Sequence, residues 1–202
     1  MTSLTSTEVV RKIASENNLT ISREAVHLLA DYFSFRKYKK GERILDEGDI
    51  CNQLLYLEKG MTRQFYFKNG KDLTEHIGYE GGVIVCLESY FREEPTKLII
   101  EALEPVFGWV IKKEDIVVLA DGNAEIGTFY RKIFESSLID SQVKADTLRF
   151  ASAHERYLKL LELHPEILKR APLVNIASLL QMTPETLSRV RSAVLNDKKG
   201  NE

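Results

Sequence analysis

The chain has 202 residues and a net charge of −2, and 44% of its residues are hydrophobic, which fits a soluble globular protein of one large domain or two small ones. No apolar run approaches the length of a transmembrane helix, and the first residues lack a secretory signal pattern, so we expect a cytoplasmic protein. The two cysteines, Cys51 and Cys86, form no C-x-x-C pair, which argues against a disulfide framework, a zinc site or an iron–sulfur cluster. We expect two buried or half-buried thiols and no bound metal.

The first part of the chain predicts helices followed by strands. Residues 7–35 carry apolar residues at helical spacing, and Ser22 is a good N-cap for the second of two helices. From residue 41 to about residue 112, short strand patterns alternate with turn signals, and Asn69-Gly70 is a strong hairpin signal. This alternation of short strands and turns predicts an antiparallel sandwich or barrel.

After a short helix near residue 114, a long helix is predicted from about residue 124 to residue 150. It exceeds the usual helix length and carries an apolar stripe, which favours packing against a partner chain. The alternative is a helix packed lengthwise on the strand domain of its own chain. The residues expected at a dimer interface are Ile126, Phe129, Tyr130, Ile133, Phe134 and Leu138.

A further helix is predicted in "SAHERYLKLLELHPEI", residues 152–167, and Pro165 is expected to close it. Its inward residues are Tyr157, Leu160, Leu161 and Leu163. Two short amphipathic helices then lie close together, at Asn175–Gln181 and Pro184–Leu195. Thr183 is a good N-cap for the second, and Pro184 occupies its first position, where a missing N–H costs nothing. The second helix is expected to bury Leu187, Val190 and Val194 and to expose Glu185, Thr186, Ser188 and Arg189.

This arrangement is typical of a helix-turn-helix, in which the second helix enters the major groove of DNA. Arginine can grip guanine through two acceptors, and glutamate can accept from cytosine N4. Residues 152–202 hold eight basic and six acidic residues. This small net positive charge favours contact with the negatively charged phosphates of DNA. The alternatives are a plain helical hairpin with a solvated polar face, and a ligand-binding module whose helical tail binds a protein partner.

Together, "GERILDEGD", "LYLEKG" and "TPETLSRVR" resemble the Crp/Fnr family of bacterial transcription regulators over residues 20–195. The resemblance implies an α+β fold: an N-terminal antiparallel β-roll of the cyclic-nucleotide-binding jelly-roll type, a long dimerisation helix, and a winged-helix-like helix-turn-helix domain. No C-terminal wing is evident, because the sequence ends soon after the second helix. The implied domains are a sensor over residues 1–122, a linker helix over residues 123–150 and a DNA-binding domain over residues 151–202.

The family pattern also implies roles for single residues. Glu185, Ser188 and Arg189 would read base edges, and Thr183, Thr186 and Arg191 would contact phosphate. The implied partners are a second copy of the chain, a palindromic site in double-stranded DNA and, for an activator, RNA polymerase. The family often has glycine in the turn where this chain has Gln181, so that position must tolerate a side chain or bend differently.

Cyclic AMP binders of the family use Gly-Glu and then arginine with a small residue to hold the cyclic nucleotide. Here Cys86-Leu87 and Thr96-Lys97-Leu98 stand in those places, so we expect weak or no binding of cyclic AMP. The remaining hypotheses are no ligand, an unknown small effector, or haem, for which His76 and Cys86 are candidate ligands by residue type only. The candidate effector pocket is Phe65, Phe67, Ile84, Leu87, Glu88, Tyr90, Thr96, Lys97 and Ile99.

No enzyme motif is present in the sequence. It lacks G-x-S-x-G, H-E-x-x-H, a P-loop and a dinucleotide fingerprint, and its four histidines share no helical face with ligand spacing. We therefore expect a protein that is not an enzyme.

Overall fold

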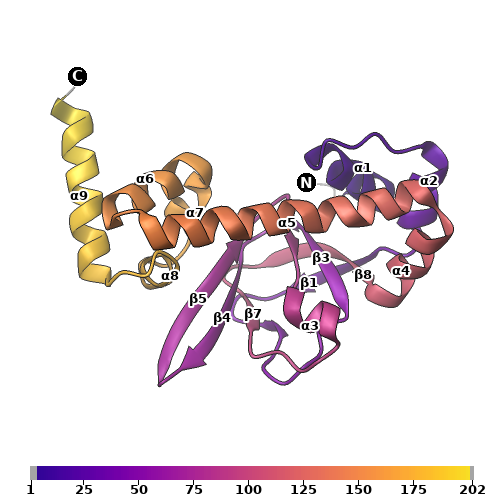
Figure 1. Cartoon of the computed structure of the whole chain (residues 1–202), viewed down its shortest axis with the longest axis horizontal. Helices are drawn as coiled ribbons and strands as arrows, with labels where there is room; N and C mark the ends of the chain where they lie inside the picture. The colour runs from indigo at the N-terminus through magenta and orange to yellow at the C-terminus, as the bar shows by residue number, and fades with distance from the viewer. Residues whose placement is uncertain (1–3, 201–202) are drawn as a thin grey trace. The chain divides into compact units, whose positions relative to one another are not determined.

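The computed structural model of the chain describes residues 4–200, drawn in Figure 1. It divides into two compact units. The first holds the N-terminal helices, most of the strands and the first part of the long helix, up to residue 139. The second joins the hairpin segment of residues 65–77 to everything from residue 140 onward. The units therefore divide the predicted linker helix and assign the hairpin to the C-terminal part of the chain.

The strands form two four-stranded sheets with the orders β1-β8-β3-β6 and β2-β7-β4-β5. The pairs β1/β8, β3/β8, β3/β6 and β2/β7 are antiparallel, as the turn spacing predicts. Asn69 and Gly70 have positive φ angles of 53° and 72° and link β4 to β5 as the hairpin signal indicates. The strands are β1 Ser34–Tyr38, β2 Arg43–Leu45, β3 Gln53–Lys59, β4 Thr62–Lys68, β5 Lys71–Gly78, β6 Val83–Ile84, β7 Ile99–Ala102 and β8 Val106–Lys112.

Two capped helices close the core of the first unit. Thr5 forms a capping box with Glu8 at the start of α1 (Ser6–Glu16), and the Ser22 hydroxyl accepts from the Ala25 N–H at the start of α2 (Arg23–Ala30). Both helices bury their apolar faces in one cluster with the inward residues of β3 and β8. Gly60 follows β3 at φ 107°, and a Cβ there would lie 2.5 Å from the Pro105 carbonyl oxygen, so only glycine fits.

The remaining helices of the first unit are α3 (Leu87–Arg92), α4 (Lys113–Gly122) and the first part of α5 (Ala124–Phe150). The predicted bounds of the long helix are confirmed. Asn123 begins it, because its Oδ1 accepts from the N–H groups of Glu125 and Ile126 at 2.9 and 3.2 Å.

One part of the interface prediction is wrong. Ile126, Phe129 and Ile133 are almost fully buried in the core of their own chain, so they are closed to a partner. They belong to the same buried cluster as residues of the strands, α1 and α2, which agrees with the alternative of a helix packed on the strand domain of its own chain. Tyr130 and Phe134 are half-buried at the edge of that core, and Leu138 is 67% exposed. Of the six residues predicted for the interface, Tyr130, Phe134 and Leu138 are therefore the ones accessible to a partner.

The helices of the second unit after α5 are α6 (Ala153–Leu163), α7 (Pro165–Arg170), α8 (Leu173–Leu179) and α9 (Pro184–Gly200). Two sequence expectations need correction here. Pro165 begins α7 as its first residue and does not merely close α6, and Leu163 is exposed. Over residues 4–200 the last strand is β8. No helix within that range is both long and apolar enough to cross a bilayer.

Candidate nucleic-acid interface

The turn between α8 and α9 is built by local hydrogen bonds. Gln181 has φ 51°, so the position where the resembling family often has glycine keeps the left-handed conformation with a side chain attached. The Met182 N–H donates to the Ala177 carbonyl at 3.0 Å, which ends α8. The Thr183 Oγ1 accepts from the Thr186 N–H at 3.2 Å, and Pro184 takes the first helical position, as predicted.

The start of α9 has one buried and one exposed face. Leu187 is fully buried, Val194 is 5% exposed and Val190 is half-buried, so all three face the other helices of the unit. Glu185, Ser188 and Arg189 lie three and four residues apart and are all exposed. At 100° per residue they form one polar face opposite the buried stripe.

Short contacts organise that polar face. The Arg189 Nη2 donates to the Thr186 Oγ1 at 3.3 Å, which lays the guanidinium along the helix. Hydrogen bonds from its own backbone and then from Thr183 lower the pKa of Glu185, with a smaller contribution from the Arg189 charge. Glu185 is therefore an ionised acceptor at neutral pH. Arg191 is exposed at the flank of the same face, and Thr186 is half-buried.

A small core holds the two helices of the motif together. Ala177 is 1% exposed, and its small side chain allows α8 and α9 to pack closely. The remaining apolar residues of this core come from α6, α7, α8 and α9 and fix the angle at which α9 is presented. They are Tyr157, Leu160, Ile167, Ile176, Leu179, Leu180, Leu187 and Val194.

The β4–β5 hairpin segment contacts this motif within the second unit. The Thr74 N–H in β5 donates to the Ser178 Oγ in α8 at 2.8 Å. The Lys144 ammonium in α5 donates to the Glu75 carbonyl, and its Nζ lies 3.4 Å from the Glu75 carboxylate. These contacts could not be predicted from sequence patterns, because the paired residues are 69 and 104 positions apart.

The residues predicted for an effector pocket differ in exposure and in their partners. Phe67, Glu88 and Lys97 are exposed, and Glu88 is paired with Arg92 one helical turn away, at 3.4 Å. Tyr90 is buried, and its hydroxyl accepts from the Tyr130 hydroxyl on α5 at 3.3 Å. The others are apolar or internally bonded: Ile84, Ile99 and Phe65 are buried, Leu87 is half-buried, and the Thr96 Oγ1 accepts from the Leu98 N–H at 2.9 Å.

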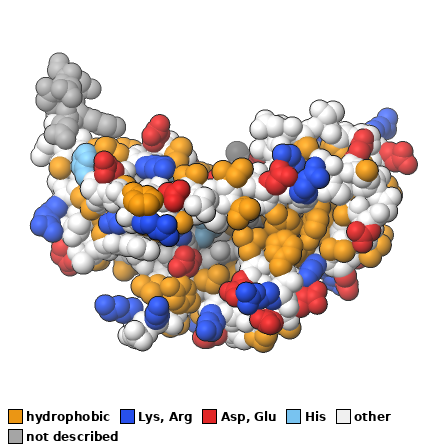
Figure 2. All heavy atoms as spheres, in the orientation of Figure 1, with side chains coloured by type: hydrophobic (Ala, Val, Ile, Leu, Met, Phe, Trp, Pro, Cys, Tyr) orange, Lys and Arg blue, Asp and Glu red, His pale blue; other side chains and the backbone are white. Residues whose placement is uncertain are grey.

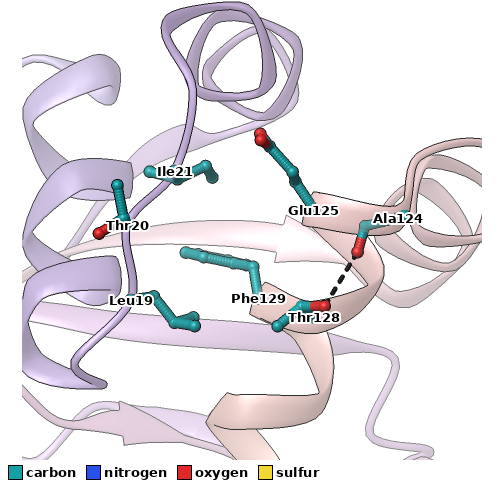
Figure 3. Close-up of a pocket in the computed structure, with 7 residues that line it drawn as sticks. All are labelled: Leu19, Thr20, Ile21, Ala124, Glu125, Thr128 and Phe129. Carbon is teal, nitrogen blue, oxygen red and sulfur yellow. Dashed lines mark hydrogen bonds between the residues drawn. The ribbon is translucent and has the colours of Figure 1, made fainter.

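Two hollows among the described residues of the first unit bear on the effector prediction. One lies where the segment of Leu19, Thr20 and Ile21 faces Ala124, Glu125, Thr128 and Phe129 of α5, and Figure 3 shows their side chains around it. It includes none of the predicted pocket residues, and Glu125 at its rim accepts from the Ser22 hydroxyl at 2.5 Å. The other lies between the sheets and has room for about one water molecule. Its lining is Ile44, Leu45, Cys51, Gln53, Leu55, Ile84 and Ile100.

No group of three or more His, Cys, Asp or Glu side chains among the described residues is placed to hold a metal ion. Cys51 and Cys86, which the sequence separates by 35 positions, lie side by side. The Cys86 N–H donates to the Cys51 Sγ at 3.4 Å. Both thiols are buried, as expected.

Comparison with known proteins identifies the fold. Residues 35–123 match the family model of the cyclic nucleotide-binding domain. FixK2 from Bradyrhizobium japonicum is similar with a TM-score of 0.70 and 18% identity, over 82% of this chain and 86% of that one. The catabolite activator protein of Thermus thermophilus is similar with a TM-score of 0.55 and 21% identity, over 91% of this chain and 88% of that one. The global regulator CLP of Xanthomonas campestris, described as responsive to c-di-GMP, is similar with a TM-score of 0.66 and 16% identity, over 88% of this chain and 93% of that one.

Compared with curated protein sequences, the chain has no match. Residues 35–123 are thus a cyclic nucleotide-binding domain in the sense of the family model, and the chain has the fold of Crp/Fnr-type regulators. The resemblance seen in the sequence is confirmed at this level, as is the α+β architecture of a strand roll, a long helix and a helix-turn-helix.

Proposed function

We propose that the chain is a sequence-specific, DNA-binding transcription regulator of the Crp/Fnr type that acts in the cytoplasm as a homodimer and is not an enzyme. The observation that carries the proposal is the exposed polar face of Glu185, Ser188 and Arg189 at the capped start of α9. A helix presented in this way can reach base edges in the major groove with its first turns. Arg191, Thr183 and Thr186 flank that face and would contact phosphate.

The proposed dimer uses the outward side of α5. Figure 2 shows apolar side chains gathered over α3 and the neighbouring part of α5. The Phe91 ring is 53% exposed and lies 4.8 Å from the Phe134 ring, and the exposed Leu138 and Ile139 follow along the same helix. An apolar surface of this kind on a long helix suits a second copy of the same helix. Two copies would present two α9 helices to two half-sites one turn of DNA apart.

We also propose that the strand roll binds cyclic AMP weakly or not at all. The hollow between its sheets is lined by apolar side chains and has room for about one water molecule. The Arg63 guanidinium in β4 is paired with Glu101 at 3.1 Å, and the Lys97 side chain is exposed. A buried cyclic phosphate needs a cation and several N–H donors around it. Calorimetry that gives a micromolar dissociation constant for cyclic AMP would overturn this part.

The DNA-binding proposal is tested by titrating the chain with a fluorescent duplex of random sequence over a series of salt concentrations. Contacts with phosphate release counterions, so the logarithm of the affinity should fall with the logarithm of salt by about 0.9 per contact. Arg191→Ala should reduce that slope by about one, and Lys169→Ala, on the exposed side of α7, should leave it unchanged. An affinity that does not respond to salt would instead favour a helical tail that docks on a protein.

A further inference from the structure

The candidate feature is the pair of thiols inside the strand roll. Cys51 lies in the segment between β2 and β3, and Cys86 is the residue before α3. The Cys86 N–H donates to the Cys51 Sγ, with the nitrogen 3.4 Å from the sulfur. The two residues are 3% and 1% exposed, so this contact is isolated from bulk water.

The backbone on both sides of the pair is already fixed. The Cys51 N–H donates to the Ser89 Oγ at 2.9 Å, and the Ser89 hydroxyl donates to the Glu94 carbonyl at 2.6 Å. The Gly48 N–H donates to the Thr96 carbonyl, and the Thr96 N–H donates to the Asp49 carbonyl, both at 2.8 Å. These bonds hold the two segments in place, with the Cys86 N–H already against the Cys51 sulfur.

We propose that Cys51 and Cys86 are an oxidative modification site, at which a small hydroperoxide converts the two thiols into an intramolecular disulfide. The Cys51 side chain lines the small hollow between the sheets, and hydrogen peroxide, the smallest hydroperoxide, reaches the sulfur when the residues around that hollow move apart. Intracellular disulfides are mostly transient and redox-sensing, so a reversible bond here is in keeping with a cytoplasmic regulator.

The two thiols have different roles in this reaction. The hydrogen bond from the Cys86 thiol, assisted by the Cys86 N–H, lowers the pKa of Cys51 to about 7, against the opposing effect of burial. The hydrogen bond to Cys51 and burial raise the pKa of Cys86 far above its usual range. Cys51 is therefore the nucleophile, because the thiolate is the reactive form, and Cys86 keeps its proton until the second step.

In the first step the Cys51 thiolate attacks one peroxide oxygen. The O–O bond breaks, Cys51 becomes a sulfenic acid, and the proton released by Cys51 neutralises the departing alkoxide or hydroxide. In the second step the Cys86 sulfur displaces hydroxide from Cys51, and the Cys86 proton joins it as water. Two thiols and one hydroperoxide thus give one disulfide, one alcohol or water from the peroxide, and one further water.

The modification would change the support of the long helix. The Tyr90 N–H donates to the Cys86 carbonyl at 2.8 Å, and the Tyr90 hydroxyl accepts from Tyr130 on α5. The Tyr90 ring also lies 5.5 Å from the Phe134 ring. A disulfide would restrain the residue that precedes α3, and Tyr90 connects α3 to α5. An effect on DNA affinity rests on the proposed function, whereas the disulfide itself does not.

The test treats the reduced full-length chain with hydrogen peroxide and follows free thiols after denaturation, together with non-reducing peptide mass mapping. One equivalent of peroxide should consume both thiols and yield a single cross-linked peptide pair, Cys51 with Cys86, which dithiothreitol reverses. Bulky glutathione disulfide should react far more slowly. Free thiols that persist, or a disulfide that joins two chains, would overturn the proposal without any variant being made.

Three variants sharpen the result. Cys86→Ser should stop at a sulfenic acid on Cys51, trapped by dimedone, and Cys51→Ser should leave Cys86 as a thiol. Cys86→Ala should move the rise in Cys51 alkylation rate from about pH 7 to higher pH, because the stabilising hydrogen bonds of the thiol are lost. An unchanged pH profile would contradict the assignment of Cys51 as nucleophile. A disulfide that forms without altering DNA affinity would reject only the coupling to α5, and DNA binding without a disulfide would reject only the thiol site.

Discussion

The Thr74 N–H in β5 donates to the Ser178 hydroxyl in α8 over 2.8 Å, which ties a strand hairpin to the first helix of the helix-turn-helix. Thr74 is buried, so water has little access to its N–H if this bond is lost. This bond is the best-defined polar contact between the hairpin segment and the helices of the second unit. Its loss is therefore expected to loosen the hairpin before it affects the helical core.

We predict that Ser178→Ala lowers the free energy of unfolding by about 1 kcal/mol, because it leaves a buried donor unsatisfied. The Thr74 amide should exchange with deuterium faster than in the parent chain. Ser192→Ala is the matched control, since the Ser192 hydroxyl donates only to the Ser188 carbonyl within exposed α9. Equal exchange at Thr74 in both variants would contradict the contact.

His76 in β5 gives a pH-dependent prediction. Desolvation, and then the positive charges of Lys144 and His164, lower its pKa, although the residue remains open to solvent and water limits the shift. The folded state then binds a proton less readily than the unfolded state, whose histidine pKa is near 6.5. Stability contributed by His76 is present above about pH 6.5 and is lost as the pH falls from there toward the folded pKa.

Lys144→Met should raise the pKa of His76 toward its ordinary value, because the neighbouring positive charge is removed. An NMR titration of the His76 ring measures this directly. Lys159→Met is a suitable control, because Lys159 in α6 donates to the Thr147 hydroxyl and is not among the groups that shift His76. A His76 titration that is unchanged in Lys144→Met would show that Lys144 does not act on the ring.

Thr183→Ala should destabilise the helix-turn-helix by about 1 kcal/mol, because the cap on the Thr186 N–H is removed. Thr183→Ser keeps the hydroxyl and should retain most of that stability. Thermal unfolding followed by circular dichroism compares the three chains. Equal melting temperatures for the alanine and serine variants would mean that the cap contributes nothing.

Leu138→Glu should shift the chain from dimer to monomer without unfolding it, since the leucine is 67% exposed on α5. Val118→Glu introduces the same charge at a 71% exposed position of α4 and should leave the dimer intact. Sedimentation velocity distinguishes the two states. A Leu138→Glu chain that sediments like the parent would place the dimer contact elsewhere.

Local patterns predicted the elements well because their signals are local. The Asn69-Gly70 turn, the Ser22 and Thr183 caps and the full extent of α5 each depend on residues a few positions apart. The polar face of α9 follows from helical periodicity alone, so Glu185, Ser188 and Arg189 were found exposed together. Their contacts with DNA stay a prediction.

Long-range proximity is what the sequence could not show. The apolar stripe of α5 does not show which of its residues face the core of their own chain. Ile126, Phe129 and Ile133 were therefore assigned to a dimer interface, although they are buried in that core. The contact of Cys51 with Cys86 and that of Thr74 with Ser178 depend on how the strands and helices fold back. Glu88 and Lys97 are exposed, and their residue types alone do not tell whether they would face a pocket or the solvent.

The most direct measurement is selection of bound sequences from a random duplex pool, with Arg189→Ala and Lys169→Ala in parallel and with cell extract added to supply any effector. The account predicts enrichment of a two-fold symmetric site with half-sites one DNA turn apart. Arg189→Ala should lose about 1–3 kcal/mol and relax preference at one base pair in each half-site, while Lys169→Ala keeps the site unchanged. No enriched sequence with or without extract, or an Arg189→Ala chain that selects the same site equally well, would contradict base reading by α9.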